Sequence, residues 1–336
     1  MTDVETLLTA SRLYYELGET QERIAEILGL TRPQVSRLLK EARSEGIVEI
    51  RVIDATHQPA DLEERLSERF GLRIAALTPR LAGPSDLTRR MLGRRAAHLL
   101  RDHIRAGTLI GVGEGAAMSA TADALAEPIP EVRATFVPLS GGGFISPSKD
   151  PIRRMADSFH GQPLELFAPG LVYDPDARLA LLGHLGNQTV ARAWEKLDVA
   201  LFGIGGYVRS EAWFGPELVA EMDQAGTVGE ILIHPFDLDG NFVSDRLQEL
   251  VVGFDPRDLR RVPLTIAVAG GKDKVRPILG ALRTGAINAL VTDEDTAQAV
   301  LDLDLVTGPG RTDRRRGERR GGAGPQNHPA VVAGGA

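Results

Sequence analysis

The side chains of this sequence that are best placed to act together lie near its start and alternate with apolar residues at helical spacing. Guanidinium, ammonium, amide and hydroxyl groups pair well with phosphate oxygens and with base edges in the major groove of DNA. The six residues are Thr31, Arg32, Gln34, Ser36, Arg37 and Lys40. Residues 31–43 have four basic side chains against one acid, a net charge of +3, although the whole chain carries −7. We therefore predict a local face for double-stranded DNA on an acidic protein.

Two short helices are predicted to hold this face in place. The inner side of the first is formed by four apolar residues at helical spacing, Ile24, Ala25, Ile27 and Leu28. Gly29 ends that helix, because glycine readily takes the positive φ of a helix C-terminus. Thr31 and Gln34 form a capping box at the start of the second helix, with Pro33 in its first turn. The segment predicts a helix-turn-helix; the alternative is a helical hairpin with a solvated charged face.

Composition narrows the class of protein further. The chain has 336 residues, enough for about two domains, and no cysteine, which excludes disulfides, thiolate catalysis and zinc fingers. Its seven histidines show no metal-ligand spacing, so we predict neither a metal site nor a cofactor. The sequence shows no secretion signal and no apolar run long enough to span a bilayer, and we expect a cytoplasmic protein without a membrane partner.

The chain is predicted to divide into three parts. Residues 1–56 form the helix-turn-helix domain and end in a short strand at 47–52, a candidate wing beside the DNA. Residues 57–307 alternate strands with helices, which predicts an α/β domain with a mainly parallel sheet between helical layers. Its predicted strands are 74–77, 108–112, 135–139, 199–204, 230–233, 264–268 and 289–291. Residues 308–336 are rich in glycine and arginine, and we predict a disordered tail that either adds non-specific DNA affinity or has no role.

Glycine-rich turns follow four of the predicted strands. They are residues 111–115, 140–143, 203–206 and 270–274. Ligands of open parallel sheets bind beyond the carboxyl ends of the strands, where glycine lets backbone N–H groups approach and a helix start favours an anion. The four turns together predict a ligand site. Tight strand-to-helix turns require glycine in any case, so each turn taken alone carries little weight.

Taken in order, these segments resemble the SorC family of bacterial transcriptional regulators. The resemblance rests on TQERIAEILGLTRPQVSRLLK near the start and on GTLIGVGEGAAMSATADAL, VALFGIGG and LTIAVAGGKDKVRPILGALRTGAINALVTDE in the body, and it covers about residues 8–301. It implies a Rossmann-like effector domain similar to sugar-phosphate isomerases. It also implies a homodimer or, more usually, a homotetramer, whose affinity for operator DNA changes when a sugar or sugar phosphate binds.

The resemblance assigns candidate effector-binding residues to the turns and to one later loop. They are Gly113, Glu114, Gly115, Ala116, Gly141, Gly142, Gly143, Gly205, Gly206, Asp245, Gly271, Lys272 and Lys274. Where the family offers small hydroxyl residues, this chain has Glu114. A carboxylate repels phosphate but accepts hydrogen bonds from sugar hydroxyls, so an unphosphorylated sugar or polyol stays open beside a sugar phosphate. Lys272 and Lys274 either hold the effector or are surface lysines, and Asp245 is either pocket wall or ordinary loop charge.

These observations lead to one main hypothesis and two rivals. The main hypothesis is a transcriptional regulator, not an enzyme, controlled by a sugar, polyol or sugar phosphate. The first rival is an isomerase-like enzyme fused to a helix-turn-helix, for which Glu114, Asp245 and Lys272 are candidate acid–base groups that no motif pairs. The second rival is a DNA-binding scaffold without an effector. Trp213 is either a core or interface residue or stacks on a sugar ring in the pocket.

Overall fold

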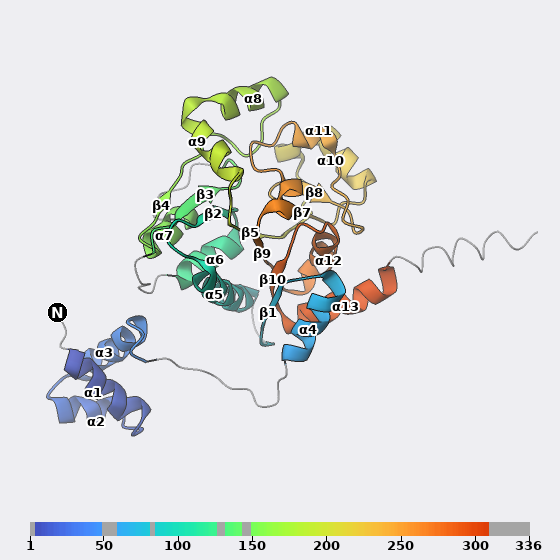
Figure 1. The fold of residues 1–336 in the computed structure, drawn as a ribbon. Coiled ribbons are helices and arrows are strands. Elements are labelled where there is room, and N and C mark those ends of the chain that lie inside the picture. Colours follow the sequence, from blue (N-terminus) through green and yellow to red (C-terminus); the bar gives the residue numbers. More distant parts are fainter. Residues whose placement is uncertain (1–3, 49–58, 81–84, 126–131, 143–148, 309–336) are drawn as a thin grey trace, which may run out of the picture.

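The N-terminal unit is a bundle of three helices. In the computed structural model, which describes residues 4–48, 59–80, 85–125, 132–142 and 149–308, they are α1 (Val4–Tyr15), α2 (Gln21–Leu28) and α3 (Arg32–Ser44) (Figure 1). The helices enclose an apolar core of their own, formed by Leu7, Ala10, Ile24, Ala25, Val35, Leu38, Leu39 and Ala42. Both predicted helices of the helix-turn-helix are present. Ile27, however, is 48% exposed and belongs to the outer surface of α2.

The turn between α2 and α3 has the predicted geometry. Gly29 has a φ of 65°, and the N–H of Leu30 donates to the carbonyl of Ala25 over 2.9 Å. Gln34 Oε1 accepts from the N–H and from the hydroxyl of Thr31, each over 2.8 Å, which fixes the start of α3. The greater part of the predicted wing strand, and the predicted tail from residue 309 onward, lie outside the described residues.

The body is built on one sheet of seven parallel strands (Figure 1). Their bounds are β1 (Ile74–Thr78), β2 (Leu109–Val112), β3 (Thr135–Pro138), β4 (Gln162–Pro163), β5 (Val199–Gly203), β9 (Leu264–Val268) and β10 (Ala289–Asp293). They lie in the order β1-β10-β9-β5-β2-β3-β4, with every neighbouring pair parallel. The chain moves outward from β2 through β3 to β4, and on the other side from β5 through β9 to β10. The strand order therefore reverses between β2 and β5.

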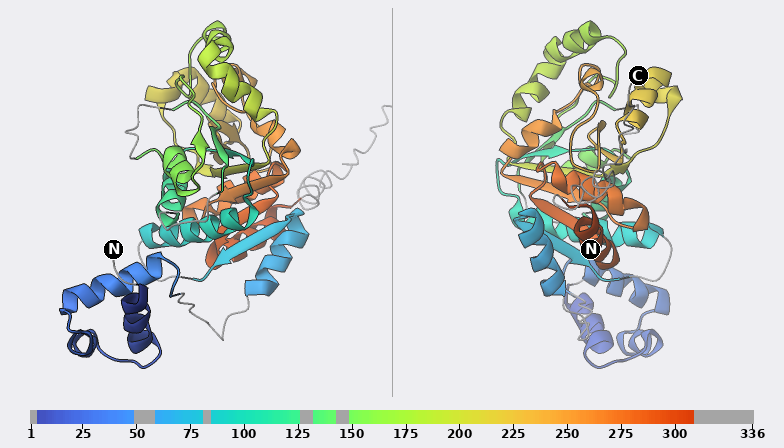
Figure 2. Two further views of the ribbon diagram at one scale, coloured as in Figure 1. Left: turned by 60° about the vertical axis from the view of Figure 1, so that its left-hand side comes forward. Right: turned by 90° about the vertical axis from the view of Figure 1, so that its right-hand side faces the viewer.

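Helices cover both faces of this sheet (Figure 2). One face packs against α5 (Ser85–His103), α6 (Ala116–Ala124) and α7 (Pro151–Ser158). The other face packs against α4 (Pro59–Phe70), α9 (Leu185–Trp194), α12 (Val275–Arg283) and α13 (Glu294–Thr307). The side chains of β5 alternate accordingly, with Leu201 toward the first layer and Phe202 toward the second. The predicted α/β class with a mainly parallel sheet is confirmed.

A small antiparallel sheet lies outside the main one. It consists of β6 (Gly205–Gly206), β7 (Gly229–Ile231) and β8 (His234–Phe236). The strand predicted at 230–233 therefore exists, but it ends at Ile231 and pairs here, not in the parallel sheet. The remaining helices are α8 (Pro175–Gly183), α10 (Glu211–Gln224) and α11 (Asp245–Gln248), with 3₁₀ turns η1 (Pro256–Arg261) and η2 (Lys272–Lys274). Gly215, with a φ of 77°, bends α10 just before Pro216.

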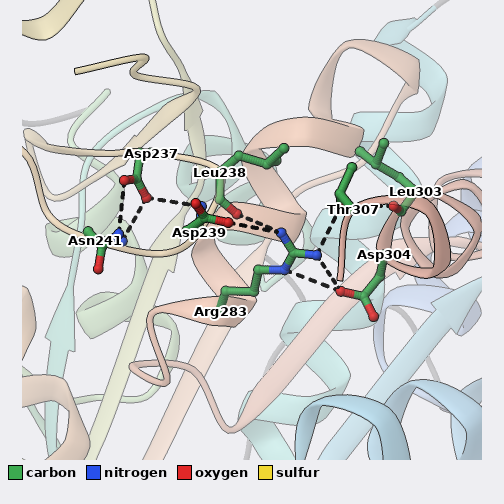
Figure 3. Close-up of polar contacts among 8 residues, drawn as sticks. All are labelled: Asp237, Leu238, Asp239, Asn241, Arg283, Leu303, Asp304 and Thr307. Atoms are coloured by element: carbon green, nitrogen blue, oxygen red, sulfur yellow. Dashed lines mark hydrogen bonds and ion pairs between the residues drawn. The ribbon is translucent and has the colours of Figure 1, made fainter. Parts of the chain in front are cut away.

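An arginine at the end of α12 ties separate parts of the body together (Figure 3). Arg283 Nη2 lies 2.7 Å from Asp304 Oδ1 on α13, and Arg283 Nη1 donates to the carbonyl of Leu238 over 3.0 Å. The second carboxylate oxygen of Asp304 accepts from Nε of Arg69 on α4 over 2.5 Å. Because the Asp304 side chain is only 2% exposed, this carboxylate is a buried junction of α4, α12 and α13.

Candidate functional site

The outer face of α3 carries the predicted DNA-contacting residues. Thr31, Arg32, Gln34, Ser36, Arg37 and Lys40 are all exposed, whereas the apolar residues between them are buried. Arg32 is engaged with α2, since its Nε lies 2.7 Å from Glu22 Oε1. Arg37 and Lys40 form no ion pair with any other residue that the structure describes. The face therefore offers cations that are available to an incoming phosphate backbone.

A cavity of about 860 Å³ opens beyond the carboxyl ends of four neighbouring strands, β9, β5, β2 and β3. The strand order reverses within this group, and such a reversal is where open α/β sheets bind ligands. All four predicted glycine-rich turns contribute to its wall. The wall is completed by the β7–β8 hairpin, the start of α5 and Trp213 from the first turn of α10. The volume is suited to a small ligand.

The cavity brings together residues that the sequence placed on separate turns. The predicted residues that line it are Glu114, Gly115, Ala116, Gly141, Gly142, Gly205, Gly271 and Lys274. Four others, Gly113, Gly206, Lys272 and Asp245, do not line it, and Gly143 lies outside the described residues. The chain therefore gathers at one place groups that are up to about 160 positions apart in the sequence.

The positions of the non-lining residues explain why they fall outside the wall. Asp245 begins α11, and its carboxylate is 97% exposed and lies 3.2 Å from Nη2 of Arg257. Lys272 is exposed on η2, whereas Lys274, at the end of the same turn, is half-buried and lines the cavity. Gly113 is buried behind the wall, and Gly206 pairs with β7. These positions favour the reading of Asp245 and Lys272 as ordinary surface charges, against the predicted pocket role.

Two glutamates face the cavity, and each lies against a glycine. Glu114 directly precedes Gly115 at the start of α6, and its Oε1 occupies the place that a Cβ at Gly142 would take. Glu230 of β7 lies in the same way against Gly205, its partner in the antiparallel β6–β7 pair. A side chain at either glycine would therefore displace the end of the neighbouring glutamate.

The hairpin turn that follows Glu230 is strained. Leu232 and Ile233 have φ values of 52° and 71°, in the left-handed region that bulky and β-branched residues avoid. The N–H of Ile233 donates to Oε2 of Glu230 over 2.8 Å, and Nδ1 of the buried His234 lies 2.7 Å from the carbonyl of Leu232. Burial lowers the pKa of His234 to about 4, so the neutral ring donates through Nδ1. Strain of this kind persists only where neighbours fix the backbone, and it is common at ligand sites.

The two cavity carboxyl groups titrate above their usual range. Burial raises the pKa of Glu114, and the nearby charge of Asp150 raises it further. Burial also raises the pKa of Glu230, which the N–H of Ile233 and the Lys274 ammonium partly oppose. The sequence does not single out Glu230, because a short apolar strand gives no sign that it pairs beside the cavity.

Trp213 is 48% exposed and lines the cavity. Its carbonyl accepts from the hydroxyl of Tyr173 over 2.8 Å, which links the first turn of α10 to the segment before α8. An indole ring at the edge of such a cavity provides an apolar face for a sugar ring. This position favours the pocket role for Trp213 over the core role.

Within the described ranges, no group of three or more His, Asp or Glu side chains is arranged to hold a metal ion. In the same part of the chain, no helix combines the length and the apolar character that crossing a membrane requires.

Both units of the chain match models of known protein families. Residues 54–302 match the family model "Putative sugar-binding domain", and residues 5–65 match the model "Crp-like helix-turn-helix domain". The sorbitol operon regulator of Klebsiella pneumoniae is 28% identical over 319 residues, which cover 89% of this chain and 98% of that protein. The deoxyribonucleoside regulator of Bacillus subtilis (strain 168) is 32% identical over 311 residues, covering 88% and 96%. The crystal structure of the full-length Klebsiella regulator SorC has a TM-score of 0.72 at 28% identity, covering 90% of this chain and 99% of that one.

The three-helix unit and the α/β body together define a DNA-binding transcriptional regulator with a sugar-binding domain. The chain belongs to the SorC family of such regulators. Its relatives are named as regulators and not as enzymes, so the isomerase-like alternative is set aside. The predicted family and class of function are thereby confirmed.

Proposed function

We propose that this regulator reads an operator with the exposed face of α3 and that a sugar, polyol or sugar phosphate in the cavity controls its grip on DNA. One observation carries the proposal: a SorC-family chain combines a capped α3 with an exposed basic face and a cavity at the strand-order reversal. We assign Arg37 to base readout and Arg32 and Lys40 to phosphates, with Thr31, Gln34 and Ser36 at the same interface. Such a regulator acts in the cytoplasm.

The helix α13 is the proposed connection between the cavity and the DNA-binding unit. In the cavity wall, the N–H of Gly271 donates to Oδ2 of Asp293 over 2.8 Å. Asp293 also caps α13, since its Oδ1 accepts from the N–H of Thr296 over 3.0 Å. Further along α13, Asp304 holds Arg69 of α4, the first described helix after the DNA-binding unit. An effector that binds one arrangement of these elements more tightly than another shifts the DNA affinity.

Self-association is the second part of the proposal. One helix-turn-helix contacts one half-site, and pairing two of them raises affinity through effective concentration. The apolar side chains of Leu179 on α8 and Leu185 on α9 are 62% and 81% exposed, and α8 has no buried residue of its own. Exposed apolar surface of this kind fits a contact between subunits. We therefore assign the protein a homodimeric or homotetrameric state.

Selection of random DNA duplexes by the full-length protein tests this function. The selected duplex is then titrated by fluorescence anisotropy with and without sugars, polyols and their phosphates. Arg37→Ala is expected to weaken binding by about 1–3 kcal/mol and to relax the preference at one base pair. Arg261→Ala, a matched change at an 84% exposed side chain in the body, is expected to leave the affinity unchanged.

Two outcomes would contradict the proposal in different ways. An equal loss of affinity on all duplexes after Arg37→Ala would reject base readout by that residue. A DNA affinity that no carbohydrate changes would favour a scaffold without an effector.

A further inference from the structure

The positive groups of the cavity wall already have carboxylates beside them. The ionisable residues that line the cavity are Glu114, Glu230, Asp273, Arg89 and Lys274. Lys274 lies close enough to Glu230 to favour its charged form. Arg89 Nη1 lies 3.4 Å from Oδ1 of Asp86, one turn earlier on α5. With three acidic and two basic side chains, the wall has a net negative charge when all five are ionised.

Glu114 stands where a phosphate group would otherwise bind. It directly precedes Gly115, the N-cap of α6, and the start of a helix after a glycine-rich turn is the usual phosphate position in such a sheet. Its carboxylate lies against Gly142, and Asp150 is close enough to disfavour additional negative charge. A phosphate dianion at this point would meet repulsion.

The same groups suit hydroxyls. An ionised carboxylate only accepts hydrogen bonds, and each sugar hydroxyl has one to donate. Glu114 reaches the cavity from the turn after β2 and Glu230 from β7, so a ligand meets acceptors from two separate elements. The Lys274 ammonium adds a donor for a ring or hydroxyl oxygen, and Trp213 adds an apolar face. These are complementary to an uncharged ring or chain that carries several hydroxyls.

We propose that the effector is a sugar or polyol without a phosphate group, held through its hydroxyls by Glu114 and Glu230. The inference rests on the proposed function, because it concerns the same cavity. Lys274 donates to the ligand. Glu114 selects against the phosphorylated form of the same compound.

Matched pairs of ligands test this selectivity on the full-length protein. Thermal shift is measured with D-sorbitol, D-glucose, D-ribose and 2-deoxy-D-ribose, each beside its terminal monophosphate. At least one free compound is expected to stabilise the protein at a concentration at least tenfold lower than its phosphate. A phosphate that acts at lower concentration than its free partner overturns the inference and leaves the regulatory function in place. A panel without any response counts against a carbohydrate effector, and so against both.

Removing the charge of Glu114 is expected to change the affinities for the free and the phosphorylated compound in opposite directions. Glu114→Gln is expected to lower the affinity for the free compound at least tenfold and to raise the affinity for its phosphate several-fold in calorimetric titration. The amide keeps the shape of the side chain and removes its charge. A merely unfolded variant would lose both ligands. Glu217→Gln, a 77% exposed carboxylate on α10 that does not line the cavity, is the matched control. Wild-type selectivity in Glu114→Gln overturns the inference.

Discussion

One oxygen of the Glu114 carboxylate lies against Gly142 in the cavity wall. A methyl group there would occupy the place of Oε1 of Glu114, whereas the backbone conformation itself is open to alanine. Gly142→Ala is therefore expected to displace the Glu114 carboxylate and to weaken effector binding at least tenfold, with a stability loss below about 0.5 kcal/mol because only the end of a flexible side chain has to move. Gly183→Ala, where a new Cβ meets nothing within 4 Å, is the control. Calorimetric titration of both variants checks this, and wild-type affinity in Gly142→Ala would contradict it.

The buried ring of His234 makes stability depend on pH. Its folded pKa of about 4 lies below the ordinary 6.5, so the unfolded chain takes up the proton first as the pH falls. Stability is therefore lost between pH 6.5 and 4, and the loss between pH 7.5 and 5.0 is about 2 kcal/mol. Urea unfolding followed by tryptophan fluorescence reports on the body, where both tryptophans lie.

The control for this titration is His234→Gln. Its stability at pH 7.5 is lower, but its dependence on pH between 7.5 and 5.0 is expected to be flatter by about 2 kcal/mol. The raised pKa values of Glu114 and Glu230 act in the opposite direction, since their contribution is lost as the pH rises, but they are present in both variants. Parallel pH profiles would show that His234 does not carry the effect.

At this scale the sequence predicts some cavity residues and not others for a physical reason. Glu114 and Lys274 could be predicted because each lies in the turn after a parallel strand, and the ends of such strands gather at one edge of the sheet. Glu230 could not, because it comes to the cavity through a hairpin whose turn places Leu232 and Ile233 at positive φ. No local sequence pattern predicts that conformation, because it depends on hydrogen bonds of Glu230 and His234 that form only in the folded chain.

Among the helices, α13 connects two separate regions of the body. Its start contacts the cavity turn through Asp293. Its later part holds Arg69 and, as Figure 3 shows, Arg283 through Asp304. Asp304→Asn leaves two arginines facing a neutral group in a buried place. We expect a loss of about 3 kcal/mol in the free energy of unfolding, measured with urea. Asp302→Asn, an exposed position on the same helix, is expected to change it by less than about 0.5 kcal/mol, and equal effects would contradict the junction.

Strands and helices could be predicted from the sequence where their apolar residues follow a single regular pattern. The buried strands of the main sheet show unbroken apolar runs, and six of them were placed within two residues of their observed ends. β4 has two residues and a proline, and β6 has two glycines, so neither has a pattern to detect. α8 buries no residue, so it has no inward apolar face from which a helix could be predicted. The pairing of β7 depends on a turn, which periodicity does not report.

For DNA binding by the whole molecule, the positions of the charges matter more than the net charge. The chain carries −7, yet the α3 face is positive, and Arg32 at its start is held by Glu22. DNA binding releases counterions from the phosphates that the face neutralises, so the affinity should fall steeply with salt. The acidic body contributes long-range repulsion that is screened beyond about 10 Å at 0.1 M salt. Local charges on the DNA face should therefore outweigh distant ones.

Two variants with the same net charge separate these effects. Glu22→Gln frees Arg32 for phosphate and is expected to tighten operator binding about threefold at low salt, with the gain shrinking as salt rises. Glu68→Gln changes the net charge equally, but at an exposed position on α4, and is expected to leave the affinity within about 1.5-fold. Fluorescence anisotropy between 50 and 300 mM salt, about the range in which phosphate contacts are lost, measures both. Equal gains in the two variants would mean that overall charge governs binding, and the Arg32–Glu22 pair would then have no special part in it.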